Sequence, residues 1–459
     1  MKPIPLFGVG VKSQSANVTA QRRINFYLEE RPDGDKTAIV AIGTPGTTSF
    51  ADLGDTAVRG MWSVGDYAYV VHRGTFYEIN NAGVATSKGT IDTTSGRVSI
   101  SDNGTQVMIA TGTSGYIYTI SGGAFAIISD GDYPGGDTVT FLDGYFIVNS
   151  PDTGKFYISA SYNGAAWDAL DFATAEYSPD KLIAVSSIGS RLLLHGEFTT
   201  ETWINTGALD FPYTRVSSIE WGLAARWSVA KFGHGTIFLA KNRMGQVQVV
   251  YMEGNTPAIV SPPDMDYLFN NSTIGDASGF SYLHNGHPFY QLNFPTTGES
   301  WLYDGATKVW SQLKSGTGRH RAEIGINYLN RTIVSDYSNG KIFNVDGDVY
   351  TDNGDTIISE LVSRHLVNQQ ERLTITQVYA ELEAGAGLAT GQGSDPQVML
   401  SYSKDGGHTF GTERMRSMGK VGEYKQRAKW FRLGQAYDWV FKLKISDPVK
   451  RVVLAAWAK

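Results

Sequence analysis

The chain has 459 residues, of which 41% are hydrophobic, 18% charged and 12% aromatic, with 52 glycines and a net charge of −6. Such a composition is typical of a folded protein with many short strands and tight turns, and the length exceeds what one hydrophobic core usually spans. The absence of cysteine excludes disulfides, thiolate metal sites and cysteine nucleophiles. No stretch has the continuous apolar run of a signal peptide or a membrane span, so we expect synthesis in a cytoplasm without membrane insertion.

Residues 1–57 form an extended leader ahead of the repeats described next. The leader contains the strand-like segment Arg22–Glu30, "RRINFYLEE", followed by the Pro- and Gly-containing stretch "GTPGTTSF". We expect Arg22–Glu30 to pair with the last repeat. That pairing would close a ring of repeats and would cover an exposed sheet edge.

Residues 58–350 repeat one layout: an apolar strand, a Gly or Asp/Asn turn, a second apolar strand, and an aromatic strand that ends near Gly. Seven copies begin at Val58, Gly96, Asp137, Leu182, Arg226, Ser278 and Ala322. Their spacing fits the period of about 40 to 50 residues of a four-stranded propeller blade. We therefore predict an all-β protein built on a β-propeller of about seven blades, within a range of six to eight.

The turns and the alternation of side chains support strands over helices. The sequence His284-Asn285-Gly286 lies between alternating apolar runs and supplies the positive φ angles that tight hairpins need. Tyr67, Tyr69 and Val71 alternate with a period of two, which is typical of a strand. We expect helix only in short connectors such as residues 165–176.

The blade pattern stops near residue 351, and residues 351–459 form a new set of strand-like segments. The alternation of Trp439, Phe441, Leu443 and Ile445 predicts a separate antiparallel β-sandwich-like domain. This domain has 15 Lys and Arg against 12 Asp and Glu, which leaves 24 against 33 for residues 1–350. The body is therefore acidic, and the C-terminal domain is slightly basic.

A cluster of basic residues lies within the C-terminal domain. Its members are Arg414, Arg416, Lys420, Lys425, Arg427, Lys429 and Arg432. Such a cluster can contact an acidic protein surface or nucleic acid. A solvated loop and strand face explains the same pattern, and the sequence leaves both interpretations open.

Residues 403–410 match the Asp-box pattern S-x-D-x-G-x-T-[WF]. The matching positions are Ser403, Asp405, Gly407, Thr409 and Phe410. The carboxylate of such a box accepts backbone N–H groups across a tight hairpin, and the aromatic residue anchors the hairpin in its sheet. We interpret the motif as a structural turn, since a single copy outside the propeller is little evidence for a glycosidase.

The sequence contains no secure catalytic or metal-binding motif, so we expect a protein that is not an enzyme and has no cofactor. His284 and His287 are close in sequence, but a hairpin turn separates them and no third ligand is evident nearby. Two other classes stay open. A propeller glycosidase requires paired carboxylates at the propeller axis, and a carbohydrate-binding adhesin or tail-fibre module requires exposed aromatic platforms.

The order of these parts resembles the packaged-DNA stabilization proteins, also called tail hub or nozzle proteins, of short-tailed bacteriophages. The resemblance rests on "RRINFYLEE", "GTPGTTSFADLG" and "VRGMW" before the repeats. It also rests on the stretch from Val367-Asn368-Gln369-Gln370-Glu371 through "VMLSYSKDGGHTFGTERM" to "DWVFKLKISDPVKRVVLAAW". It covers nearly the whole chain. Each motif is modest by itself, and the order of the motifs carries the resemblance.

The resemblance implies a virion protein of the phage tail that forms a ring of six copies below the portal and its adaptor ring. Such a ring lines the channel through which the genome leaves and holds the DNA until infection. The implied partners are other copies of the chain, the portal–adaptor ring, distal needle, spike or fibre proteins, and double-stranded DNA that passes without sequence specificity. An acidic body fits a conduit, because a basic lumen would hold DNA through its phosphates.

Overall fold

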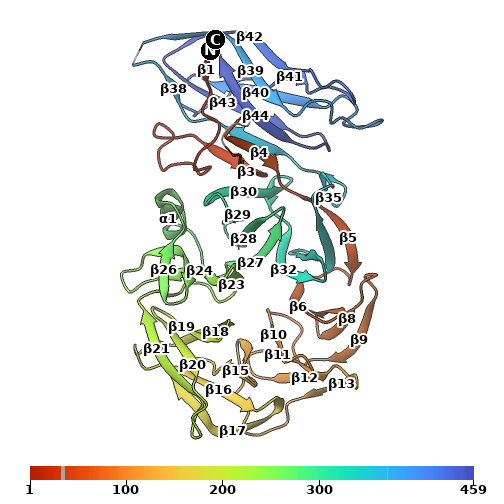
Figure 1. The fold of residues 1–459 in the computed structure, drawn as a ribbon, viewed down its shortest axis with the longest axis vertical. Coiled ribbons are helices and arrows are strands. Elements are labelled where there is room, and N and C mark those ends of the chain that lie inside the picture. The colour runs from red at the N-terminus through yellow and green to blue at the C-terminus, as the bar shows by residue number, and fades with distance from the viewer. Residues whose placement is uncertain (33–36, 370) are drawn as a thin grey trace.

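The computed structural model describes residues 1–32, 37–369 and 371–459, so Gln370 of the Val367–Glu371 motif lies outside the described residues. A ring of sheets forms the larger body, and a two-layer arrangement of strands stands at one end of it. Both chain termini lie in this second body (Figure 1). In the described part of the chain, no helix is long and apolar enough to cross a membrane.

Seven blades surround one axis and form a β-propeller, so the predicted fold class is confirmed. The first blade contains β6 (Val58–Val64), β7 (Tyr67–His72), β8 (Thr75–Ile79) and β9 (Ala85–Thr90). The second contains β10 (Ser99–Asp102), β11 (Gln106–Ala110), β12 (Gly115–Thr119) and β13 (Ala124–Ile127). The third contains β14 (Val139–Leu142), β15 (Tyr145–Asn149), β16 (Lys155–Ala160) and β17 (Asn163–Thr174), and the fourth contains β18 (Leu182–Ile188), β19 (Arg191–Gly196), β20 (Thr200–Asn205) and β21 (Tyr213–Ile219). The fifth blade contains β22 (Gly222–Leu223), β23 (Ala230–Phe232), β24 (Gly235–Lys241), β25 (Val247–Glu253) and β26 (Thr256–Ile259). The sixth contains β27 (Ser278–His284), β28 (His287–Phe294), β29 (Glu299–Asp304) and β30 (Val309–Ser315), and β31 (Gly318–Arg319) pairs with β30. The seventh contains β32 (Ala322–Tyr328), β33 (Arg331–Asp336), β34 (Lys341–Asp346) and β5 (Gly46–Asp52).

The middle strands of the blades are buried on both faces, because each blade packs between two neighbours. In β7, Tyr69 and Val71 pack into a core shared with the second blade. The alternate residues Ala68 and Val70 pack into a core shared with the seventh. The alternation of side chains along β7 therefore directs them into two different cores, and does not divide a buried face from a solvent-exposed face.

The predicted hairpin turn at His284–Gly286 has the backbone that its sequence requires. Asn285 has φ 50° and Gly286 has φ 82°, so both residues adopt the positive φ of a tight hairpin. This prediction is confirmed.

The ring closes through the leader, at a different segment from the one expected. The strand β5 pairs antiparallel with β34 and completes the seventh blade, with Ser49 opposite Phe343. The expected segment, Arg22–Glu30, does not pair with the seventh blade. It forms β2 (Arg22–Ile24) and β3 (Phe26–Glu30), which pair elsewhere.

A second expectation concerned a helix within residues 165–176, and it was wrong. Most of this segment belongs to β17, which pairs with β16 through two register shifts. The one helix among the described residues is α1 (Pro263–Asn270), between the fifth and sixth blades. Met265 and Phe269 of α1 are fully buried against the sixth blade's core, which accounts for a helix at this point.

Two sheets enclose the core of the sandwich. One has the order β3, β4 (Ile39–Gly43), β44 (Val452–Ala458), β39 (Leu373–Leu382) and β42 (Ala428–Ala436), with β1 (Lys2–Pro3) on β44. The other contains β37 (Ser359–Val362), β43 (Asp438–Ile445), β40 (Gln397–Ser403) and β41 (Arg414–Ser417), with β38 (Leu366–Val367) on β43. Trp430 of the first sheet and Trp439 and Phe441 of the second are fully buried between them.

Candidate functional site

The propeller and the sandwich share one continuous sheet. The strand β2 pairs in parallel with β30 of the sixth blade, with Ile24 opposite Gln312, and antiparallel with β37 of the sandwich. A second connection joins β5 to β35 (Thr351–Asp352), which forms a short hairpin with β36 (Asp355–Thr356). We call this region the joint. Backbone hydrogen bonds across the joint fix the two bodies relative to each other (Figure 1).

Arg23 connects three segments inside the joint and is 1% exposed. Its guanidinium donates to Ser311 Oγ at 2.8 Å, to the Trp310 carbonyl at 2.7 Å and to the Gly8 carbonyl at 3.0 Å. Burial lowers its pKa to about 10, and the more distant Asp304 only partly offsets this effect. The side chain thus holds the leader against the sixth blade through neutral acceptors.

Arg451 is a second buried arginine of the joint, also 1% exposed. Its Nη2 donates to the Thr44 carbonyl at 2.9 Å, and its Nη1 lies 3.5 Å from the carbonyls of Tyr350 and Ile357. Burial lowers its pKa to about 10. It therefore holds the start of β44, the segment before β5 and the connector after the seventh blade together.

Asp352 supplies the negative charge of the joint and is 4% exposed. Its carboxylate accepts from Thr47 Oγ1 at 2.7 Å, from Ser315 Oγ at 2.6 Å and from Arg321 Nε at 2.7 Å. Burial alone would raise its pKa, but His320, Ser315, Arg321 and Thr47 outweigh burial and lower the pKa. One carboxylate therefore joins three parts of the chain that are far apart in sequence.

The five Asp-box residues come together in the hairpin after β40. Asp405 accepts from the Thr409 backbone N–H at 3.0 Å and from the hydroxyls of Thr409 and Ser403 at 2.5 Å each. The Gly407 N–H donates to Ser403 Oγ at 2.8 Å. The hydrogen bonds of Ser403 and Thr409 lower the pKa of Asp405 below its ordinary value.

The Asp-box hairpin packs on the N-terminal segment, a role that the sequence did not show. Phe410 packs against a small core that contains Ala20. His408 Nε2 lies 3.2 Å from Asn17 Oδ1, and nearby His365 binds the Ala16 carbonyl at 2.8 Å. The hairpin therefore fixes the leader where it enters the joint.

The basic residues predicted from sequence lie on β41, on β42 and in the loop between them. Arg414 is half-buried, and the other six are exposed. Part of the cluster is structural: Arg416 Nε donates to the Lys429 carbonyl at 2.8 Å, and Arg414 Nη1 donates to the Phe431 carbonyl at 3.2 Å. Two arginines thus connect β41 to β42, which lie side by side without backbone pairing.

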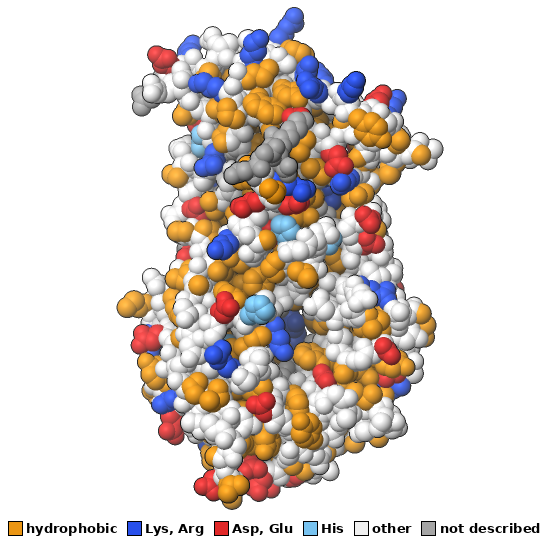
Figure 2. Space-filling view, viewed as in Figure 1, with side chains coloured by type: hydrophobic (Ala, Val, Ile, Leu, Met, Phe, Trp, Pro, Cys, Tyr) orange, Lys and Arg blue, Asp and Glu red, His pale blue; other side chains and the backbone are white. Residues whose placement is uncertain are grey.

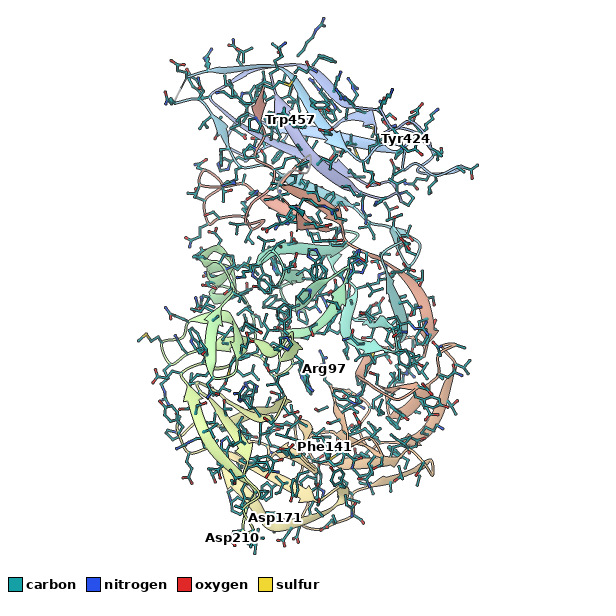
Figure 3. All side chains as sticks on the ribbon, viewed as in Figure 1. Arg97, Phe141, Asp171, Asp210, Tyr424 and Trp457 are labelled. Carbon is teal, nitrogen blue, oxygen red and sulfur yellow. The ribbon has the colours of Figure 1, made fainter. Side chains whose placement is uncertain are left out.

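Exposed apolar side chains accompany these cations, which the sequence analysis missed. Tyr424 is 76% exposed, Met415 and Val421 are 58% exposed, and Phe431 is 55% exposed. We call these four residues and the seven basic residues the basic face. Figure 3 places Tyr424 at the outer edge of the sandwich, and Figure 2 shows Lys and Arg gathered at this end of the molecule. Of these residues only Phe431 is on β42, where it follows the alternation of buried and exposed positions; Met415 is on β41, and Val421 and Tyr424 lie in the loop.

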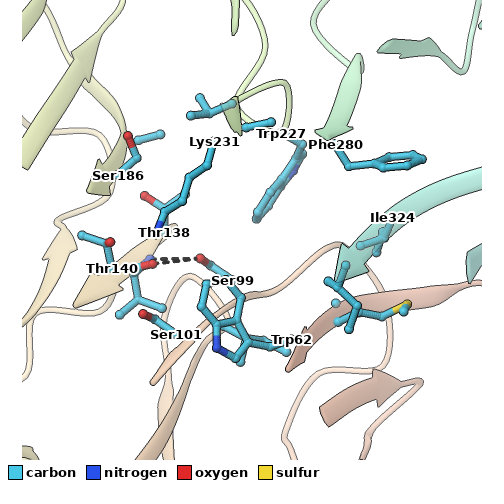
Figure 4. A pocket seen from close by; sticks show the side chains of 18 of the residues that line it. Trp62, Ser99, Ser101, Thr138, Thr140, Ser186, Trp227, Lys231, Phe280 and Ile324 are labelled. Atoms are coloured by element: carbon cyan, nitrogen blue, oxygen red, sulfur yellow. Dashed lines mark hydrogen bonds between the residues drawn. The ribbon is translucent and has the colours of Figure 1, made fainter. Parts of the chain in front are cut away.

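The inner strands of the seven blades enclose an open channel of about 560 Å³ along the propeller axis (Figure 4). Side chains join neighbouring blades around it: Trp62 Nε1 donates to Asp102 Oδ2 at 2.6 Å, the Thr140 and Ser187 hydroxyls lie 2.7 Å apart, and Ser63 Oγ donates to the Asn327 carbonyl at 2.6 Å. Asp102 is the one carboxylate among the described residues that line the channel. The paired carboxylates of a glycosidase are not brought together there.

The two histidines singled out in the sequence, His284 and His287, are opposite each other across the β27–β28 hairpin. His287 Nδ1 lies 2.9 Å from Asp304 Oδ2. Burial is the main cause that lowers the pKa of His284. Across residues 1–32, 37–369 and 371–459, no group of three or more His, Cys, Asp and Glu side chains is placed to hold a metal ion.

A propeller joined through a buried joint to a sandwich places the chain among the large all-β proteins. Comparison with protein families identifies the family of this chain. The model of the bacteriophage P22 Gp10 β-propeller matches residues 2–350, and that of the P22 Gp10 β-sandwich matches residues 359–459. The chain belongs to this family, the packaged-DNA stabilization proteins of short-tailed phages, and the expected resemblance is confirmed. The chain is therefore a phage structural protein.

Several solved structures share the propeller fold with this chain. The WD40 β-propeller domain of Doa1 is 12% identical, with 65% of this chain and 96% of that chain covered and a TM-score of 0.41. YCF48 bound to D1 peptide is 12% identical, with 67% and 98% covered and a TM-score of 0.44. The computationally designed Ika8 protein is 10% identical, with 75% and 100% covered and a TM-score of 0.41. A comparison with curated proteins finds no match.

Proposed function

We propose that six copies of this chain assemble into a ring in the tail of a short-tailed phage, below the portal and its adaptor ring. The ring lines the DNA exit channel and retains the packaged DNA until ejection. The family match carries the proposal, since residues 2–350 and 359–459 correspond in order to the two domains of Gp10. In this role the chain is a wall and a contact surface, with no reaction to catalyse.

The joint supports a role as part of a wall. A subunit that bears the load of packaged DNA has to keep its domains in fixed positions. Here β2 continues the sixth blade into the sandwich, and Arg23, Asp352 and Arg451 are buried in the same region. Interfaces between domains of one chain are ordinarily small and allow movement. A shared sheet with buried charges removes that freedom.

The propeller axis is too narrow to be the duct for DNA. An inner strand of seven residues is roughly 23 Å long at about 3.3 Å per residue. A channel with about 560 Å³ open to the centres of water molecules is then roughly 8 Å wide on average, once the radius of a water molecule is added. The major groove of the duplex alone is about 12 Å wide. The DNA duct of the proposed ring therefore lies between the copies.

The negative charge of residues 1–350 supports a DNA duct formed between the copies. Residues 1–350 carry 24 Lys and Arg against 33 Asp and Glu. A duct wall that is predominantly acidic repels the DNA phosphates, whereas a basic wall would slow the exit of the genome. A duct of the assembled ring that is lined mainly by Lys and Arg would contradict this part of the proposal.

The basic face is proposed as a protein contact of the ring. Its exposed Tyr424, Met415 and Phe431 lie among cations, and aromatic, Met and Arg side chains are enriched at protein interfaces. The acidic body of a neighbouring copy offers a complementary charge. Other contacts of the ring are proposed with the portal–adaptor ring and with distal needle, spike or fibre proteins.

Electron microscopy of the purified chain mixed with portal–adaptor complexes tests the proposal. A six-fold ring that caps the adaptor is expected, and portal–adaptor complexes alone serve as the control. Mass photometry of the chain alone gives an independent measure of self-association. A chain that leaves the adaptor uncapped at saturating concentration would contradict the proposal, and a stable trimer with glycan affinity would favour the adhesin class.

A further inference from the structure

The axial channel is lined by Arg97, whose charge is not fully neutralised. Glu323 accepts from Arg319 at 2.7 Å and from Arg97 only at 3.4 Å. Arg97 Nε is inaccessible to solvent and has no hydrogen-bond partner among the described residues. Burial lowers the pKa of Arg97, Glu323 raises it and Arg319 lowers it. One carboxylate is thus shared between two guanidinium groups.

Trp227 and Lys231 offer two further donors in the same channel. The guanidinium of Arg97 lies over the indole of Trp227, 5.2 Å from the ring centroid. Within the described chain, neither Trp227 Nε1 nor Lys231 Nζ has a hydrogen-bond or ion-pair partner, and both residues line the channel. Figure 4 shows Trp227 and Lys231 pointing into the channel, and Figure 3 shows Arg97 at its open centre. An arginine, an indole and an ammonium group therefore line one channel.

The wall of the channel also offers hydroxyl groups at fixed positions. Ser99 Oγ accepts from the Val139 N–H at 3.0 Å, and Thr140 is held by Ser187. Ser101 and Ser186 also line this wall. The volume of about 560 Å³ is within the range of small-molecule sites, and bonds between blades keep the space open without a ligand. The channel is thus a preformed cavity whose wall carries both cations and hydroxyl groups.

We propose that the axial channel binds an anionic monosaccharide. Its carboxylate or phosphate pairs with Lys231 and Arg97, and its hydroxyls bond to the indole N–H of Trp227 and to the serine and threonine wall. A carboxylate and a phosphate present the same acceptor chemistry to these donors, so acidic sugars and sugar phosphates are both included. This site goes beyond the proposed tail role and does not depend on it.

Fluorine NMR of the full chain labelled with 5-fluorotryptophan tests the site directly. The chain has 10 tryptophans, and Trp227→Phe identifies the signal of Trp227. The probes are glucuronate and glucose 6-phosphate, with glucose and inorganic phosphate as controls. We expect an acidic sugar to shift the Trp227 signal, and calorimetry to show at least about tenfold weaker binding of glucose, since a charge-assisted bond is lost.

Lys231→Gln is the decisive variant, and Lys341→Gln on the outer part of the seventh blade is its matched control. Lys231→Gln should weaken binding of the acidic sugar by about tenfold, whereas Lys341→Gln should bind within about twofold of the wild type. Circular dichroism melts establish that both variants are folded. Unchanged binding by Lys231→Gln, or no shift of the Trp227 signal with either acidic sugar, would overturn the proposal. Equal binding of inorganic phosphate would overturn the sugar assignment.

Discussion

The buried carboxylate of Asp352 gives a quantitative test of the joint. It accepts hydrogen bonds from Thr47, Ser315 and Arg321. Asp352→Asn keeps the shape of the side chain but removes its charge, so Arg321 loses its buried partner. Removal of one partner of a buried ion pair destabilises a protein by about 3–5 kcal/mol. Arg321 keeps a bond to Asp355 at 2.7 Å, so we expect the lower end, about 3 kcal/mol.

Calorimetry converts this value into a melting temperature. If the joint makes the propeller and the sandwich unfold together, the unfolding entropy of about 2.1 cal/mol/K per residue over 459 residues is roughly 1 kcal/mol/K. A loss of about 3 kcal/mol then lowers Tm by about 3 °C. Differential scanning calorimetry of wild type and variant measures the shift and shows whether one transition is retained.

Asp355→Asn is the matched control, because Asp355 pairs with the same arginine but its side chain is 74% exposed. Exposed ion pairs contribute about 0–1 kcal/mol, so its Tm should fall by no more than about 1 °C. Equal shifts for the two variants would refute the reasoning, because burial of the carboxylate would then have no effect. A wild-type protein that melts in two separated transitions would refute the premise of a rigid joint.

Three further outcomes are expected. His195 is fully buried, and burial lowers its pKa to about 3, so on acidification the unfolded chain takes up a proton before the folded chain does. Below about pH 6.5, His195 should therefore lower the free energy of unfolding by up to about 1.4 kcal/mol per pH unit. Urea titrations at several pH values measure this slope, and His195→Gln should flatten it. Asp405→Ala should speed hydrogen exchange at the Thr409 amide, measured by mass spectrometry, because Asp405 is its acceptor; unchanged exchange would argue against the turn. Lys425→Glu with Lys429→Glu should weaken ring assembly in mass photometry, more so at low salt, whereas Lys12→Glu with Lys341→Glu, the same change of charge elsewhere, should not.

The propeller could be predicted because its signals are local. A hairpin turn such as Asn285-Gly286 determines its own φ angles, and the first hairpin of each blade contains at least one residue with positive φ. The closing strand could not be found in this way. β5 contains Gly46 and polar residues that indicate a turn in isolation, and it becomes a strand because β34 presents a free edge to it. The same holds for residues 165–174, which form a strand that pairs with β16.

The joint could not be seen in the sequence because most partners of its buried charges lie far away along the chain. Arg23 lies in "RRINFYLEE" beside Arg22, and nothing local distinguishes the buried arginine from its neighbour. Its acceptors are carbonyls of Gly8 and Trp310, one of them 287 residues away. The basic cluster shows the converse. The sequence gives its composition correctly but cannot show that Arg416 bonds to the carbonyl of Lys429 and so acts partly as a structural residue.

The joint also determines how charge is distributed in the proposed ring. Residues 1–350 are acidic and residues 351–459 carry a small positive excess, and Figure 2 shows the basic side chains at the sandwich end. In a flexible two-domain chain this separation would average out as the domains moved. Because β2 and the buried Arg23 and Arg451 fix the two bodies, every copy presents the same charge at the same level. In the proposed ring, the basic end of each copy therefore meets the same part of the acidic body of its neighbour, so the complementary charges of the ring contacts stay in register.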